Sequence, residues 1–222
     1  MQTYVALLYS IILGEGRRVI MADLKAMAEG LGLKNPRTLV ATGNLVFETK
    51  ATDIAGLEQR LETAFEKTFG RHVDIIVRRA DDWLALAAGN PFPIESAATA
   101  DQVAVRVMRK PVPAEAAATL QAYVGDDEKM QAVGGDIWIV FSRATPSSRL
   151  IAATSHKRLG IGTSRNWNTV RRLAESWWTT LTFSLARFLC EVFYAQPTFF
   201  WNQMPIQEFN GVRSSGGDRP GG

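Results

Sequence analysis

Hydrophobic and polar positions in the first eighty residues alternate in a pattern that predicts four strands and two helices. Leu24, Met27, Ala28 and Leu31 recur at helical spacing, whereas the opening run is apolar and rich in β-branched and aromatic residues. The predicted elements are, in order, strand 3–9, helix 21–31, strands 37–41 and 45–49, helix 53–69 and strand 73–78. Asp53 is a candidate N-cap of the second helix. This βαββαβ order is the ferredoxin-like plan.

The same order of elements recurs in the second half of the chain. The predicted elements there are strand 102–108, helix 113–123, strands 129–133 and 137–141, helix 148–159, a short strand near Thr163 and a terminal helix from Asn168 to about Ser176. A helix over 81–89 connects the halves and ends at Asn90-Pro91-Phe92-Pro93, which cannot continue a helix. We therefore expect an α+β protein with two ferredoxin-like subdomains in tandem, at 1–80 and 100–176, joined by residues 81–99.

The C-terminal part has an unusual composition. About half of the aromatic residues of the chain lie between Trp177 and Phe209. Arg187 and Glu191 interrupt this apolar stretch, so no membrane span is expected. We expect an aromatic-rich extension at 177–201 that promotes self-association, and a disordered tail at 202–222.

Composition excludes several classes of protein. The 222 residues are 46% hydrophobic and carry a net charge of only +3, which does not by itself indicate a nucleic-acid or membrane binder. One cysteine, Cys190, and two separated histidines fit no zinc pattern, so no metal and no cofactor are expected. The apolar N-terminal run lacks the basic flank and cleavage site of a signal peptide, and a cytoplasmic location is expected.

The location of charge is more informative than its total. Between residues 137 and 174 there is no Asp or Glu, and the cations are Arg143, Arg149, Lys157, Arg158, Arg165, Arg171 and Arg172. A segment of one sign indicates an acidic partner such as RNA or DNA. The alternative is a solvated helix face.

Three loops are expected at one end of the first sheet: residues 10–18, 42–44 and 70–72. Gly14, Gly16, Arg17 and Arg18 precede a helix and are candidates for phosphate binding, although the spacing is not that of a P-loop. Thr42, Gly43 and Asn44 are typical of a tight hairpin, and the Asn44 amide is a candidate ligand contact. Each group also fits an ordinary turn. His72 is the one visible candidate for a general base there.

Arg165, Asn166, Trp167 and Asn168 place a guanidinium, two amides and an indole around a predicted helix start. A base stacked on Trp167, with Arg165 holding a phosphate, is one interpretation. The other is a capping asparagine, with Asn168 or Thr169 as the cap, beside a core tryptophan.

Five separated segments resemble the bacterial proteins of the domain of unknown function 1697 (DUF1697) family. They are Tyr4-Val-Ala-Leu-Leu8, Met21-Ala-Asp-Leu24, Thr42-Gly-Asn-Leu-Val-Phe47, Asn90-Pro-Phe-Pro93 and Ser164-Arg-Asn-Trp-Asn-Thr-Val170. The resemblance extends from residue 3 to about 175 and implies two ferredoxin-like subdomains without an assigned activity.

The chain departs from this family at two places. Tyr9, Ser10 and Ile12 stand where the family usually has arginine, glycine and asparagine, which puts the polar role of that loop in doubt. The region after about 176 has no counterpart, so it is an extension, a fusion or a shifted reading frame.

Taken together, the sequence predicts a binding module for a nucleic acid or nucleotide-like anion. The alternative is an enzyme that acts on a small phosphorylated or amide-bearing substrate at the loop end of the first subdomain.

Overall fold

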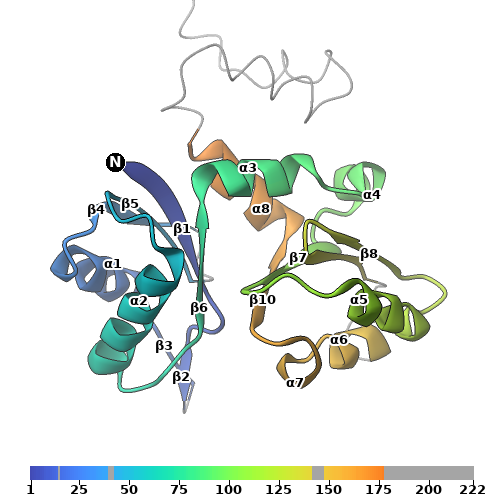
Figure 1. Cartoon of the computed structure of the whole chain (residues 1–222), viewed down its shortest axis with the longest axis horizontal. Helices are drawn as coiled ribbons and strands as arrows, with labels where there is room; N and C mark the ends of the chain where they lie inside the picture. Colours follow the sequence, from blue (N-terminus) through green and yellow to red (C-terminus); the bar gives the residue numbers. More distant parts are fainter. Residues whose placement is uncertain (15, 40–42, 142–147, 178–222) are drawn as a thin grey trace, which may run out of the picture. The chain divides into compact units, whose positions relative to one another are not determined.

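The computed structural model describes residues 1–14, 16–39, 43–141 and 148–177 (Figure 1). The described part is a mixed α+β structure with two four-stranded antiparallel sheets. Predictions that concern Thr42, Arg143 or residues 178–222 lie outside these ranges.

The first sheet has the strand order β4-β5-β1-β6. Its part of the chain contains β1 (Gln2–Leu8), β2 (Ile12–Gly14), β3 (Arg17–Arg18), α1 (Met21–Gly30), β4 (Lys34–Thr38), β5 (Asn44–Thr49), α2 (Ile54–Phe69) and β6 (Ile75–Arg79). Alternate side chains of β1, among them Tyr4, Ala6 and Leu8, share one core with Leu24 of α1 and Phe65 of α2. The two helices therefore cover one face of this sheet.

The second sheet has the strand order β10-β7-β9-β8. The elements are α3 (Ala80–Ala88), α4 (Pro93–Ala98), β7 (Val103–Met108), α5 (Ala114–Leu120), a 3-10 turn (Gln121–Tyr123), β8 (Lys129–Val133), β9 (Asp136–Val140), α6 (Arg149–Ala153), α7 (His156–Leu159), β10 (Gly162–Asn166) and α8 (Trp167–Glu175). Met108, Ile137 and Ile139 of the sheet pack with Leu120 and Leu150 of the helices.

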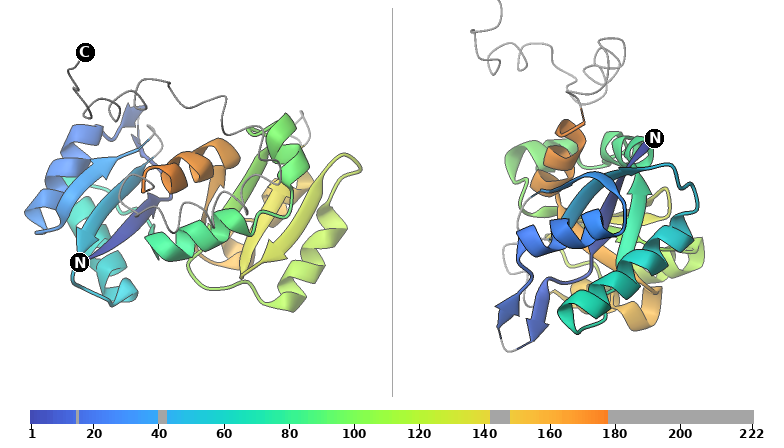
Figure 2. Two further views of the ribbon diagram at one scale, coloured as in Figure 1. Left: turned by 90° about the horizontal axis from the view of Figure 1, so that it is seen from above. Right: turned by 90° about the vertical axis from the view of Figure 1, so that its left-hand side faces the viewer.

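Two helices from distant parts of the chain lie beside each other. α3 contacts α8, and Trp83 Nε1 donates to the Val170 carbonyl oxygen over 3.2 Å. Figure 2 shows the pair in green and orange. α3 also packs against β1 and β6, so residues after the first sheet help to bury its second face.

Several predicted elements differ in detail. The loop 10–18 contains a two-stranded ribbon, β2–β3, because Gly14 (φ 111°) and Gly16 (φ 75°) allow the chain to reverse. The predicted helix 148–159 is two helices, since Thr154 ends α6 and turns its hydroxyl back to the Ile151 carbonyl. The connecting segment contains the unpredicted α4, with a proline in its first turn.

The described helices include none that is long and apolar enough to cross a membrane.

Candidate functional site

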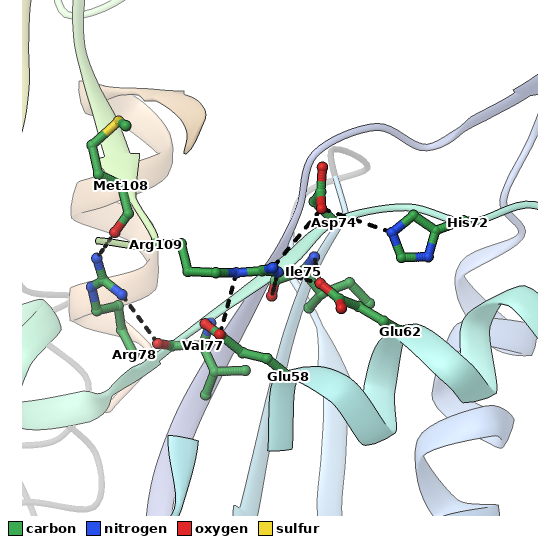
Figure 3. Close-up of polar contacts among 9 residues, drawn as sticks. All are labelled: Glu58, Glu62, His72, Asp74, Ile75, Val77, Arg78, Met108 and Arg109. Atoms are coloured by element: carbon green, nitrogen blue, oxygen red, sulfur yellow. Dashed lines mark hydrogen bonds and ion pairs between the residues drawn. The ribbon is translucent and has the colours of Figure 1, made fainter. Parts of the chain in front are cut away.

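Two arginines link the sheets reciprocally (Figure 3). Arg109, directly after β7, makes ion pairs with Glu58 (3.3 Å) and Glu62 on α2 and also donates to the Ile75 carbonyl oxygen of β6 at 2.9 Å. Arg78 of β6 reaches in the other direction and donates to the Met108 carbonyl oxygen. Each half of the chain thus contributes an arginine that binds acceptors in the other half.

The carboxylates of this network also protect a sheet edge. Glu58 Oε1 accepts from the Val77 amide and Glu62 Oε1 from the Ile75 amide, both at 2.9 Å. The outer edge of β6 is therefore occupied by side chains instead of another strand.

Burial is the largest influence on the pKa values of two acids in the network, Glu58 and Asp136. Burial raises the pKa of Glu58 above its ordinary value, although the Val77 amide and Arg109 act in the opposite direction. Burial also raises the pKa of Asp136, which accepts from the Met108 amide at 2.7 Å and lies 3.6 Å from Arg78 Nη2.

Arg165 makes a third link, with neutral groups alone. From β10 it donates to Asn44 Oδ1 (2.6 Å), to the carbonyl oxygens of Leu8 (2.9 Å), Gly43 (3.3 Å) and Ser164 (2.9 Å), and to the Thr163 hydroxyl (2.8 Å). Burial lowers the pKa of its guanidinium to about 10. Arg165 and Asn44, both predicted as ligand contacts, are thus buried in the contact between the two sheets.

The predicted convergence of loops at one sheet end is present in the described residues. Arg71 Nη1 donates to the Ile12 carbonyl oxygen over 3.1 Å, and the Leu8 amide donates to the Gly43 carbonyl oxygen over 2.9 Å. Gly43 has φ 76°, and a Cβ there would lie 2.6 Å from Ile11 Cγ2. Asn44 does not share the positive φ expected of a turn residue, because it is already in β5.

Exposed cations gather on the ribbon at this end. Arg17 and Arg18 form β3 and are exposed, and Arg71 lies beside the ribbon strand β2. We call these three residues the ribbon cluster. None of them forms an ion pair with a carboxylate of the described residues. In Figure 1 the ribbon extends below the first sheet, with Gly14 and Gly16 at its turn.

A second group of cations lies on the short helices α6 and α7. The guanidinium carbons of Arg149 and Arg158 lie 5.9 and 5.0 Å from the centre of the Tyr123 ring. Lys157 is exposed beside them. We call Arg149, Lys157 and Arg158 the helix cluster. It too lacks an acidic partner in the part of the chain that the structure describes.

The segment Asn166-Trp167-Asn168 begins α8. The N-cap is Asn166, not Asn168 or Thr169, because its side chain accepts from the Thr169 amide (3.1 Å) and hydroxyl (2.9 Å). Trp167 is half-buried against Trp138, with ring centres 5.9 Å apart. Capping by Asn166 and packing of Trp167 thus give these two residues structural roles.

His72 lies between two acids near the same sheet end. Its Nδ1 is 3.7 Å from Glu66 and its Nε2 is 3.8 Å from Asp74. The ring is about half exposed, and Figure 3 shows it beside Asp74. A histidine between carboxylates has the chemistry of a proton acceptor. Within the described ranges, no group of three or more acidic, His or Cys side chains is placed to hold a metal ion.

Neither the network of Arg78 and Arg109 nor the burial of Arg106 was predicted. One sequence signal could have indicated Arg106, because it is the single charged residue inside the apolar run Val103–Met108. A cation in such a run is either paired across an interface or held for a ligand.

Comparisons with known proteins agree with this architecture. A family model described as a protein of unknown function (DUF1697) matches residues 1–138. The solved structure of the conserved bacterial protein SP0830 from Streptococcus pneumoniae is similar with a TM-score of 0.62 and 20% identity, covering 78% of this chain and 97% of that one. That likeness concerns the fold. No curated protein matches the chain.

Proposed function

The chain belongs to the DUF1697 family, and we propose that it is a binding module for a nucleic acid or a nucleotide-like anion. In this proposal it is built from two ferredoxin-like units, residues 1–80 and 100–176, with 81–99 as their connection. The observation that carries the binding role is the lack of acidic partners, among the described residues, for the ribbon and helix clusters.

The contrast with the inner arginines supports this role. Arg78, Arg109 and Arg165 are held by carboxylates or carbonyl oxygens inside the protein. Arg17 and Arg18 instead extend from a two-stranded ribbon, a shape that fits a nucleic-acid groove. Exposed guanidinium groups bind phosphate oxygens and release counterions, which supplies most of a sequence-independent affinity.

The helix cluster gives the same chemistry on the second unit. Tyr123 supplies an aromatic ring next to the guanidinium groups of Arg149 and Arg158. Aromatic faces beside cations are typical of sites for single-stranded nucleic acids. The one-signed sequence from 137 to 174 therefore supports the proposal through Arg149, Lys157 and Arg158.

Salt-dependent titration of a fluorescent single-stranded RNA tests the proposal. We expect the triple variants Arg17→Ala/Arg18→Ala/Arg71→Ala and Arg149→Ala/Lys157→Ala/Arg158→Ala each to weaken binding. Each should also lower the slope of log K against log salt by about 2, or roughly 0.7 per lost phosphate contact.

A variant with the same net charge serves as the control. Lys25→Ala/Lys34→Ala/Lys50→Ala removes three exposed cations, and the strand register places Lys34 and Lys50 at the other end of the first sheet. No binding at low salt, or an equal loss in this control, would contradict the proposal.

His72 supports a second candidate function, an enzyme acting on a small phosphorylated or amide-bearing substrate at the same sheet end. Its position between Glu66 and Asp74 favours proton transfer, and Gly14, Gly16 and Gly43 lie on the neighbouring loops. A metabolite thermal-shift screen, followed by turnover assays of His72→Gln, separates the two functions. Loss of turnover with unchanged RNA binding would favour the enzyme.

A further inference from the structure

Arg106 is a buried cation near the edge of the second sheet. It lies in β7, where it is paired in register with Ser164 of the edge strand β10 and with Ile137 of β9. Its exposed fraction is 8%. Met108, two residues along the strand, lies in the helix-covered core, so Arg106 shares that face of the sheet.

One edge of the Arg106 guanidinium has no partner. Nε and Nη2 are both buried, and neither forms a hydrogen bond with any described residue. These two nitrogens form the side-on edge of the guanidinium, which binds the two oxygens of a carboxylate in parallel. A buried donor without an acceptor is costly, and here two adjacent donors are in that state.

The other buried arginines do not have this property. Arg165 uses Nε, Nη1 and Nη2 in five hydrogen bonds, and Arg109 is surrounded by Glu58, Glu62 and Asp74. Arg109 Nε also forms no hydrogen bond, but it lies 3.3 Å from Glu58 Oε2. Among these three arginines, only Arg106 therefore has buried donors with neither a hydrogen bond nor an ion pair among the described residues.

A glycine makes room for the guanidinium at the edge of the sheet. A Cβ at Gly162 would lie 3.0 Å from Arg106 Nε and 2.5 Å from Met108 Sδ. The Arg106 side chain thus lies over Gly162 of the edge strand β10. Ser164, the register partner of Arg106 two residues further along that strand, is exposed to solvent.

Tyr9 adjoins this place from the first sheet. The Thr163 hydroxyl donates to the Leu8 carbonyl oxygen over 3.3 Å, which places the residue after Leu8 beside β10. Burial lowers the pKa of Arg106, and an interaction with Tyr9 acts in the opposite direction, consistent with their proximity. Tyr9 itself is 51% exposed.

We propose that Arg106, with Gly162 and Ser164 of β10 and with Tyr9, forms a binding site for the carboxylate group of a small monoanionic ligand. The carboxylate oxygens pair with Nε and Nη2, and the remainder of the ligand lies along Tyr9. A monoanion is favoured because Arg106 supplies a single positive charge. One of the two negative charges of a phosphate dianion would stay buried without a cation. This site shares no residue with the ribbon and helix clusters.

The experiment uses sodium acetate as the probe, against sodium chloride at equal ionic strength and near-neutral pH. Binding to the folded state alone should raise the Tm by about 3–6 °C for each tenfold increase of acetate above its Kd. In protein labelled with 15N-arginine, the Nε–H signal of Arg106 should shift saturably with acetate. Inorganic phosphate at the same ionic strength should produce a smaller effect.

Three variants give the proposal its controls. Arg106→Lys keeps the charge but lacks the fork and should bind acetate at least about tenfold more weakly. Arg106→Met should lose the acetate effect and melt at a higher temperature than the wild type in chloride, because an unpaired buried charge is removed. The ribbon variant Arg17→Ala/Arg18→Ala/Arg71→Ala should keep the full acetate effect even if it loses RNA binding.

Two results would overturn the proposal. One is an acetate response no larger than that of chloride in the wild type. The other is an acetate response in Arg106→Lys equal to that of the wild type. If phosphate is the stronger ligand, the assignment to a carboxylate is wrong.

Discussion

Arg165 donates its Nε–H to the amide oxygen of Asn44 over 2.6 Å, and this bond joins two buried residues that are 121 positions apart in the sequence. The same guanidinium binds the carbonyl oxygens of Leu8 and Gly43. One side chain of the edge strand β10 therefore completes the hydrogen bonding of two strand ends in the other sheet.

We expect Arg165→Ala to lower the free energy of unfolding by about 2–4 kcal/mol, because several buried acceptors lose their donor. Combined with Asn44→Ala, it should show a coupling energy of about 1–3 kcal/mol in urea denaturation. Arg165→Ala combined with Lys34→Ala should be additive within about 0.5 kcal/mol. An equal coupling energy in the Arg165/Asn44 and Arg165/Lys34 pairs would contradict a stabilising bond between Arg165 and Asn44.

Arg109→Ala should destabilise the protein by about 1–3 kcal/mol, since Glu58 and Glu62 would lose their cation while staying mostly buried. The exposed Arg172→Ala should change the stability by no more than about 0.5 kcal/mol. Urea denaturation of both variants measures the difference, and similar values would contradict a role of Arg109 between the sheets.

The raised pKa values of Glu58 and Asp136 predict the direction of a pH effect. The folded state keeps each proton to a higher pH than the unfolded state, so the unfolded state binds fewer protons in that window. Stability contributed by these groups should therefore decrease as the pH rises from the ordinary values of 3.8 and 4.5 through the raised ones. Urea denaturation from pH 4 upward measures the slope.

Asp136→Asn keeps an acceptor for the Met108 amide and cannot ionise. We expect it to flatten the pH dependence while leaving the protein folded. An unchanged slope in Asp136→Asn and in Glu58→Gln would assign the effect to other groups.

The cap of α8 gives a local test. Asn166→Ala should cost about 1 kcal/mol, because the Thr169 amide and hydroxyl lose their acceptor. Asn168→Ala, at the position where the sequence also allowed a cap, should cost no more than about 0.5 kcal/mol. Thermal denaturation distinguishes the two variants. A larger loss of stability in Asn168→Ala than in Asn166→Ala would mean that Asn168 is the N-cap.

The boundary of the aromatic extension is also testable. The sequence places it before Trp177, yet Trp177 is 3% exposed and Ser176 accepts from Arg37 Nη2 at 3.0 Å. Truncation after Glu175 should cost about 2–3 kcal/mol relative to truncation after Trp177, the usual value for burying a large side chain. We expect the chain 1–177 to fold and to self-associate less than the full chain in light scattering. Equal stability of the two truncated chains would mean that the extension begins at Trp177, as the sequence predicts.

The order of strands and helices could be predicted from the sequence because it depends on local periodicity. Val103–Met108 and Ile54–Phe69 have apolar patterns that specify a strand and a helix without any partner. The ribbon β2–β3 was missed because its two short strands carry no repeating pattern, and the reversal depends on the φ of Gly14 and Gly16. Helix ends also lack a repeating pattern. The N-cap of α8, for example, was predicted at Asn168 or Thr169 but is Asn166.

The site was harder to predict, since its contacts join residues far apart in the sequence. The sequence indicated Gly43, Asn44 and Arg165 as candidate ligand contacts, but nothing in it indicates that these residues contact one another. Arg109 and Glu58 carry no motif at all. Pairing of this kind depends on how two sheets meet, and composition and spacing do not contain that information.

The link through β10 also has a consequence for synthesis of the protein on the ribosome. Residues 1–79 contain all four strands of the first sheet and emerge well before Thr163 and Arg165. Until then the Leu8 carbonyl and Asn44 lack the donors that β10 later supplies. The contact between the two sheets is therefore completed late in synthesis, and until then these acceptors of the first sheet bind water or a chaperone instead.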